Sequence, residues 1–124
     1  MPYEITPDTE KRVVVIRMWG EVKPDEVRTL VAQLAADHSV AGFAHLADLR
    51  DLTSVTAIGA GDIRAIAAGV LAVSPRRAIV APDSATFGMA RMFAALRNMK
   101  DTTEQIGVFR TMREAEDWLG FTAV

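Results

Sequence analysis

The side chains best suited to chemistry in this sequence are two histidines and a set of aspartates near one arginine. His38 falls near the end of a predicted helix, and His45 lies inside a predicted strand. The sequence contains no HExxH or other paired-histidine spacing, no cysteine, and no GxSxG segment that would present a serine. Metal, thiolate and serine-nucleophile chemistry therefore lack their usual residues. We predict no catalytic residue, no metal site, no cofactor and no enzymatic activity.

One glycine-containing segment invites comparison with a dinucleotide-binding loop. Gly59 and Gly61 match the first two glycines of GxGxxG, but Arg64 replaces the third glycine, which close packing of the helix requires. No predicted strand runs directly into Gly59. The segment therefore does not predict nucleotide binding.

The composition is that of an ordinary folded protein. Hydrophobic residues make up 50% of the 124 residues and charged residues 24%, which supplies enough apolar surface for a packed core. A formal net charge of -2 offers no positive field to a phosphate backbone, so nucleic acid is not an expected partner. We expect one domain over residues 1–124. We also expect a cytoplasmic location, because the N-terminal residues lack the pattern of a secretory leader.

The elements that must position these side chains follow from hydrophobic periodicity. Residues 3–5 and 12–19 read as two strands, and Pro7 and Asp8 between them have the chemistry of a hairpin turn. A helix begins at Pro24, and its apolar residues recur with the spacing of one helical face.

The rest of the chain alternates strands with helices. Residues 43–49, 77–81 and 105–110 read as strands, and helices are predicted over about 56–72, after Asp83 or Ser84, and from 111 to Gly120. Thr111 and Glu114 form a capping box for the last helix. This order predicts an α/β fold. It is a mostly parallel five-stranded sheet with an antiparallel N-terminal hairpin strand and about four helices.

Polar residues are predicted to follow the third and fourth strands, where ligands approach parallel sheets. These candidate ligand or partner residues are Asp48, Arg50, Asp51, Ser54, Thr56, Asp83 and Ser84. Arg50 could orient an anion or simply pair with a neighbouring aspartate. Capping and loop solvation are the alternative roles for the whole set.

Three segments resemble a known family. Residues 51–64, DLTSVTAIGAGDIR, resemble the strand-loop-helix signature of STAS domains, the fold of anti-sigma factor antagonists. Residues 88–91, GMAR, and 108–120, VFRTMREAEDWLG, are similar to the SpoIIAA-like branch, also described as STAS/Sec14-like. The resemblance extends over nearly the whole chain and implies a single STAS-like domain that binds or regulates.

The sequence departs from this family at the phosphorylation site. The anti-sigma factor antagonists have an Asp-Ser-Ser-Gly-like sequence whose first serine is phosphorylated, whereas residues 59–62 here are Gly-Ala-Gly-Asp. Because Ala60 has no hydroxyl, a phosphorylation switch cannot operate at this position. Ser54 and Thr56 are nearby hydroxyls that could substitute or could cap the helix.

The predicted third helix carries more soft apolar surface than one buried stripe needs. The residues in question are Phe87, Met89, Met92, Phe93 and Leu96. They can be ordinary core, or, as the Sec14-like resemblance implies, they can line an apolar pocket. Arg91, Arg97 and Lys100 in the same helix could meet lipid headgroups if the helix rests on a membrane.

Two functional interpretations follow. The first is a non-enzymatic STAS-type module that binds or senses a small apolar or anionic ligand, with peripheral membrane contact as an option. The alternative, implied by the anti-sigma factor antagonists, is a regulatory module that binds a protein through the loop around Ser54 and Thr56. Apolar surface could equally form a homodimer interface.

Overall fold

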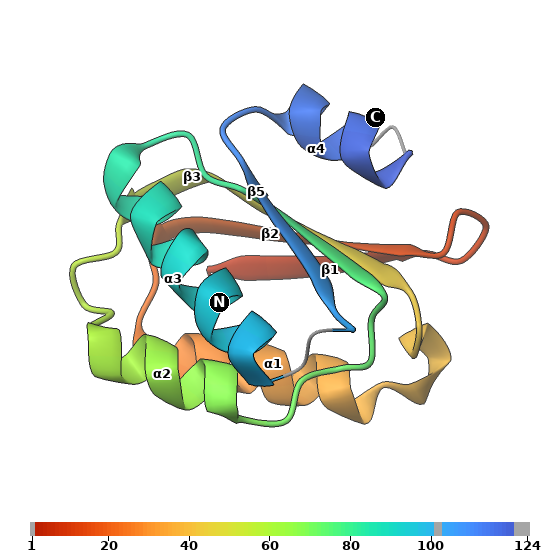
Figure 1. Ribbon diagram of the computed structural model, residues 1–124, viewed down its shortest axis with the longest axis horizontal. Helices are drawn as coiled ribbons and strands as arrows, with labels where there is room; N and C mark the ends of the chain where they lie inside the picture. Colours follow the sequence, from red (N-terminus) through yellow and green to blue (C-terminus); the bar gives the residue numbers. More distant parts are fainter. Residues whose placement is uncertain (1, 101–102, 121–124) are drawn as a thin grey trace.

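The computed structural model describes residues 2–100 and 103–120. Its centre is a five-stranded sheet in the sequential order β1-β2-β3-β4-β5 (Figure 1). β1 runs antiparallel to β2, and the other neighbouring pairs are parallel. The strands are Tyr3–Asp8 (β1), Val13–Glu21 (β2), Ala44–Ser54 (β3), Arg76–Val80 (β4) and Gln105–Phe109 (β5). The predicted α/β sheet is confirmed.

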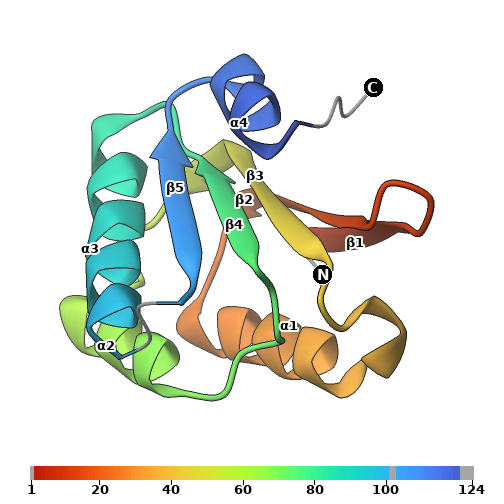
Figure 2. The same cartoon turned by 45° about the vertical axis from the view of Figure 1, so that its right-hand side comes forward.

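Three helices cover one face of the sheet and one covers the other (Figure 2). The helices are Pro24–Ala36 (α1), Ala60–Ala68 (α2), Ser84–Lys100 (α3) and Met112–Leu119 (α4), with a short 3-10 turn at His38–Val40. Sequential parallel strands joined by right-handed crossovers place every connecting helix on the same face. This explains why α1, α2 and α3 share one side. None of the helices in the described part of the chain is long and apolar enough to span a bilayer.

The pleat of β2 supplies both layers of the core. Val14, Ile16 and Met18 belong to the buried cluster on the side of α1, α2 and α3, whereas Val13 belongs to the cluster beneath α4. Successive side chains of a strand point to opposite faces of the sheet. A strand that is covered on both faces therefore needs an unbroken run of apolar residues, which β2 has.

The first helix, α1, begins where the sequence predicted, and the last helix, α4, begins and ends where its capping residues predicted. α1 begins with Pro24, and the Glu26 carboxylate accepts the Lys23 backbone N–H at 2.9 Å. In α4, the Thr111 hydroxyl oxygen accepts the Glu114 N–H at 3.2 Å. Gly120 ends α4 in the left-handed region, with φ of 69°, which glycine adopts without steric cost.

The predicted hairpin turn at Pro7 and Asp8 is wrong. Both residues belong to β1, where Pro7 lies opposite Val14 and Asp8 opposite Val13. Proline is tolerated there because β1 is an edge strand. The turn comes later, and the Asp8 carboxylate accepts the Lys11 N–H at 3.0 Å to close it.

The boundary between β3 and α2 also differs from the prediction. β3 extends to Ser54, because its second half continues to pair with β2 as far as Glu21. α2 covers only Ala60–Ala68, rather than about 56–72. Val70, which falls within the predicted helix, lies beyond the observed helix and is 81% exposed.

Candidate functional site

Two neighbouring apolar cavities lie between the sheet and the layer of α1, α2 and α3. The first, here called the Leu52 cavity, has a volume of about 160 Å³ and is lined entirely by apolar side chains. The second, the His45 cavity, has a volume of about 140 Å³. Six residues line both cavities: Met18, Leu30, Val31, Ala47, Ile79 and Phe93. The two cavities therefore form one apolar region that is divided by shared side chains.

Small residues on facing elements explain the space. Ala47 lies in the first half of β3 and Ala90 on the buried side of α3, and both line the Leu52 cavity. Each ends at Cβ, whereas the surrounding wall is built from longer side chains such as Leu30, Ile66 and Phe93. The walls hold the layers apart and the alanines leave the gap between them unfilled.

The His45 cavity has a polar end. His45 and Arg77 lie opposite each other on β3 and β4, and both line this cavity. Both are buried, at 6% and 7% exposure. Burial, followed by the nearby Arg77 charge, lowers the pKa of His45 from 6.5 to about 4. The imidazole is therefore neutral at neutral pH, and its Nε2 is buried without a hydrogen-bond partner among the described residues.

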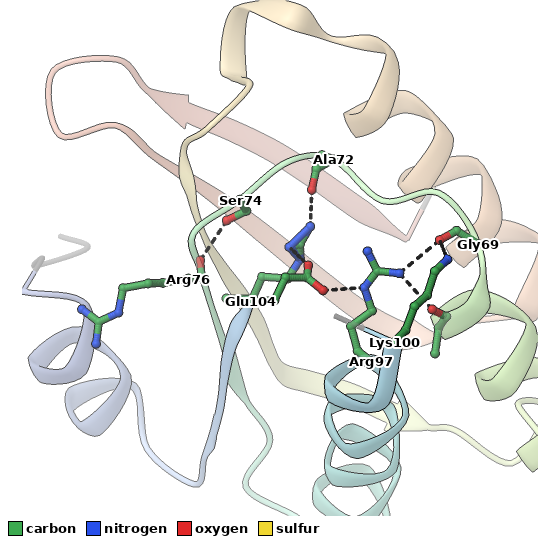
Figure 3. A network of polar contacts seen from close by, with 9 residues as sticks. Gly69, Ala72, Ser74, Arg76, Arg97, Lys100 and Glu104 are labelled. Atoms are coloured by element: carbon green, nitrogen blue, oxygen red, sulfur yellow. Dashed lines mark hydrogen bonds and ion pairs between the residues drawn. The ribbon is translucent and has the colours of Figure 1, made fainter. Parts of the chain in front are cut away.

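Arg77 belongs to a buried ionic cluster beside the cavity. Glu104 Oε1 lies 3.0 Å from Arg77 Nη1, and Glu104 Oε2 lies 2.6 Å from Arg97 Nε (Figure 3). Arg77 Nη2 donates to the Ala72 carbonyl. Burial lowers the pKa of Arg77, an effect that the Glu104 charge opposes. Two guanidinium groups thus share a single carboxylate.

The same cluster fixes the end of α2. Arg97 Nη1 donates to the Ala67 carbonyl at 2.9 Å and to the Gly69 carbonyl at 3.1 Å. Lys100 Nζ donates to the Ala68 carbonyl at 2.6 Å, and Figure 3 shows both cations reaching the same turn. Cations at a helix C-terminus satisfy its free carbonyls and its dipole. Arg97 was one of three cations that could meet lipid headgroups, but its side chain is buried and bound to Glu104 and to the end of α2.

The residues predicted to follow the third strand do not form a loop. Asp48, Arg50, Asp51 and Ser54 all lie within β3. The Asp48 carboxylate is buried and accepts two bonds from the Arg50 guanidinium, each at 2.9 Å. Although burial opposes ionisation of Asp48, hydrogen bonds and charge from Arg50 outweigh it and lower its pKa. Arg50 therefore pairs with a neighbouring aspartate, one of the two roles considered for it.

The remaining predicted polar residues are also occupied by local contacts. Asp51 pairs with Arg17 of β2 at 2.9 Å, and the Ser54 and Thr56 hydroxyls lie 2.9 Å apart. Ser84 is the first residue of α3.

Asp83 caps α3, accepting the Thr86 N–H at 3.0 Å and the Thr86 hydroxyl at 2.7 Å. These two bonds lower the pKa of Asp83. The capping role proposed for Asp83 is confirmed.

The predicted apolar set on α3 is only partly placed at the cavities. Met89 lines the Leu52 cavity, and Phe93 lines both. Phe87 instead lies under the Arg110 guanidinium, 4.2 Å from the ring centroid. Leu96 lines a shallow surface depression with Lys100. Met92 lines neither cavity.

The buried residues of α3 are Thr86, Ala90 and Arg97. The helix is therefore turned about its axis relative to the orientation that the sequence predicted.

The N-terminus of α2, from Gly59 to Asp62, contains no hydroxyl side chain that could be phosphorylated. Ala60 is its first residue, and the Asp62 carboxylate accepts the Gly59 N–H at 2.9 Å. Within residues 2–100 and 103–120, no group of three histidine, cysteine, aspartate or glutamate side chains is arranged to hold a metal ion.

Comparison with known proteins identifies the fold. No family model matches the sequence, and no curated protein matches it either. A solved structure does: an uncharacterized protein of the DUF3478 family from Shewanella loihica PV-4, described as having a SpoIIAA-like fold. The two chains are 18% identical, the match covers 94% of this chain and 91% of the other, and the TM-score is 0.57. The chain therefore has a SpoIIAA-like fold, and the resemblance seen in the sequence is confirmed at that level.

Proposed function

We propose that this protein is a non-enzymatic STAS-type binding module that holds a small apolar ligand between its sheet and its helices. The Leu52 cavity is the observation that carries this proposal. Side chains lining an empty apolar space forgo dispersion contacts that a ligand would restore. An engineered apolar cavity of about 150 Å³ in another protein stays dry and binds benzene, and the Leu52 cavity alone has about that volume.

The first test is native mass spectrometry of freshly purified protein, compared with its denatured mass. A retained apolar ligand gives an added mass that disappears on denaturation. The same spectra report the oligomeric state.

Filling the cavity provides the second test. Ala90→Leu adds three carbons inside the Leu52 cavity, and Ala95→Leu makes the same change at an exposed site on the same helix. We expect Ala90→Leu to raise the free energy of unfolding by about 1 kcal/mol and to lower affinity for an apolar probe at least about tenfold. Ala95→Leu should leave both unchanged. Equal probe affinity in the two variants would count against the proposed site.

Peripheral membrane contact is a second candidate function, favoured by one surface feature. Val70 and Met99 are 81% and 82% exposed. The residues next to them in the chain are in contact, because Lys100 Nζ donates to the Gly69 carbonyl at 3.3 Å. Exposed apolar residues beside a cation suit the interface of an anionic bilayer. Sedimentation with anionic vesicles tests this, and Met99→Glu should reduce the bound fraction if the contact forms.

Binding of a regulatory protein through Ser54 and Thr56 stays a prediction.

A further inference from the structure

One end of the His45 cavity combines an unpartnered buried nitrogen with a buried guanidinium group. Within the described ranges, three buried side-chain nitrogens lack a hydrogen-bond partner: His45 Nε2, Arg76 Nε and Arg77 Nη1. Two of the three residues, His45 and Arg77, are cross-strand neighbours that line the His45 cavity. Arg77 Nη1 lies 3.0 Å from Glu104 Oε1 and is paired with that carboxylate, so His45 Nε2 is the nitrogen of this pair of residues that has no partner. Buried polar groups normally have partners, so this end of the cavity lacks an acceptor.

The charge of the surrounding groups selects the kind of acceptor. Arg77 and Arg97 both pair with Glu104, so the buried cluster has two guanidinium groups for one carboxylate. An anionic acceptor offsets the remaining positive charge, and hydrogen bonds to charged groups are stronger than neutral ones. A carboxylate has two oxygens and can accept from both nitrogens at once.

Both nitrogens are covered by neighbouring atoms in this conformation. The χ2 torsion of a histidine is soft, however, so the His45 ring can turn its Nε2 edge toward the cavity at small cost. With its proton on Nε2, the neutral imidazole is a donor. The rest of the cavity wall is almost entirely apolar and suits an aliphatic chain.

We propose that the ligand is an aliphatic carboxylate. Its head group accepts hydrogen bonds from His45 Nε2 and Arg77 Nη1, and its chain extends through the His45 cavity into the Leu52 cavity. Each cavity is about the size of one that holds the six carbons of benzene, so the two together accommodate about a dozen carbons. This assignment rests on the proposed function, because it names the ligand of the same cavities.

A matched pair of ligands tests the head group. Dodecanoate and dodecanol have the same chain length and differ only in the head. Titration calorimetry of the wild-type protein near neutral pH should give at least about tenfold tighter binding of dodecanoate. In His45→Leu, this preference should fall by at least about fivefold, while dodecanol affinity stays the same. His38→Ala, which alters the exposed histidine, should behave as wild type. Thermal melts establish that each variant is folded.

A second measurement requires no variant. The imidazole nitrogen resonances of His45 should shift on addition of dodecanoate and not on addition of dodecanol. Equal affinity for the two ligands, or an unchanged preference in His45→Leu, overturns the carboxylate assignment and leaves the apolar cavity as proposed. Failure of both ligands to bind overturns the cavity as a ligand site as well.

Discussion

Burial of His45 makes the stability of this protein depend on pH in a defined direction. The pKa of His45 is lowered from 6.5 to about 4 in the folded protein. Between these values the unfolded chain binds a proton at this position and the folded protein does not. Protonation therefore favours unfolding, and the stabilisation by neutral His45 is complete above about pH 6.5 and is lost as the pH falls toward about 4.

The size of the effect follows from the shift. One pKa unit corresponds to about 1.4 kcal/mol, so the full change from 6.5 to about 4 amounts to about 3 kcal/mol. At about pH 5, roughly 2 kcal/mol is already lost relative to neutral pH. Asp48 and Asp83 have pKa values lowered from 3.8, so their own contributions are lost at lower pH than this window.

The assay is urea unfolding at about pH 7.5 and about pH 5 for wild type, His45→Leu and His38→Ala. His45→Leu removes the titrating group and an unpartnered nitrogen, so it should be at least as stable as wild type near neutral pH. Its loss of stability on acidification should be smaller than that of wild type by about 2 kcal/mol. His38→Ala should retain the wild-type difference, because His38 is exposed. The reasoning fails if wild type and His45→Leu lose equal stability on acidification.

Two further substitutions test how the helices and strands are held. Arg97→Met should cost about 1–3 kcal/mol, because it removes one of the two guanidinium partners of Glu104 and leaves the last carbonyls of α2 without their donor. Arg91→Met, exposed on the same helix, should change stability by less than about 0.5 kcal/mol in the same unfolding assay. Gly107→Ala should destabilise by about 1–3 kcal/mol, since its Cβ would lie 2.6 Å from Cζ of Phe109. Gly88→Ala has open space in α3 and should instead stabilise by about 0.5–1 kcal/mol. Similar melting temperatures for the two alanine variants would contradict the packing around β5.

The sequence correctly predicted the helix ends that are determined by neighbouring residues. The start of α1 at Pro24 and the ends of α4 depend on residues within a few positions of each helix terminus. The prediction was wrong for the end of β3, where pairing with a neighbouring strand determines the structure. The second half of β3 is polar and resembles a loop, but its backbone continues to pair with β2 up to Ser54. Tertiary pairing outweighed local propensity there.

The cavities were only partly predictable for a related reason. A surplus of soft apolar residues on α3 suggested either core packing or an apolar pocket, and of these residues Met89 and Phe93 line the Leu52 cavity. The rotation of α3 was not predictable, because Arg97 reads as a surface cation until its carboxylate partner and the carbonyls of α2 are in place. Ala47 and Ala90 leave the space between the layers, and nothing in the sequence shows that these two alanines share a cavity wall.

The polar end of the His45 cavity lies at the opposite end of the sheet from the usual ligand site of this kind of fold. Ligands of open parallel sheets usually bind at the carboxyl ends of the strands, which is why the sequence directed attention to Arg50 and Asp83. In the structure those groups are already satisfied, Arg50 by Asp48 and Asp83 by Thr86. A satisfied group gains little from a ligand, because it must first give up its existing bond. The unpartnered Nε2 of His45 lies near the amino end of β3 instead, opposite Arg77 of β4. We therefore expect a ligand head group to gain more free energy at that end of the sheet, beneath the helices.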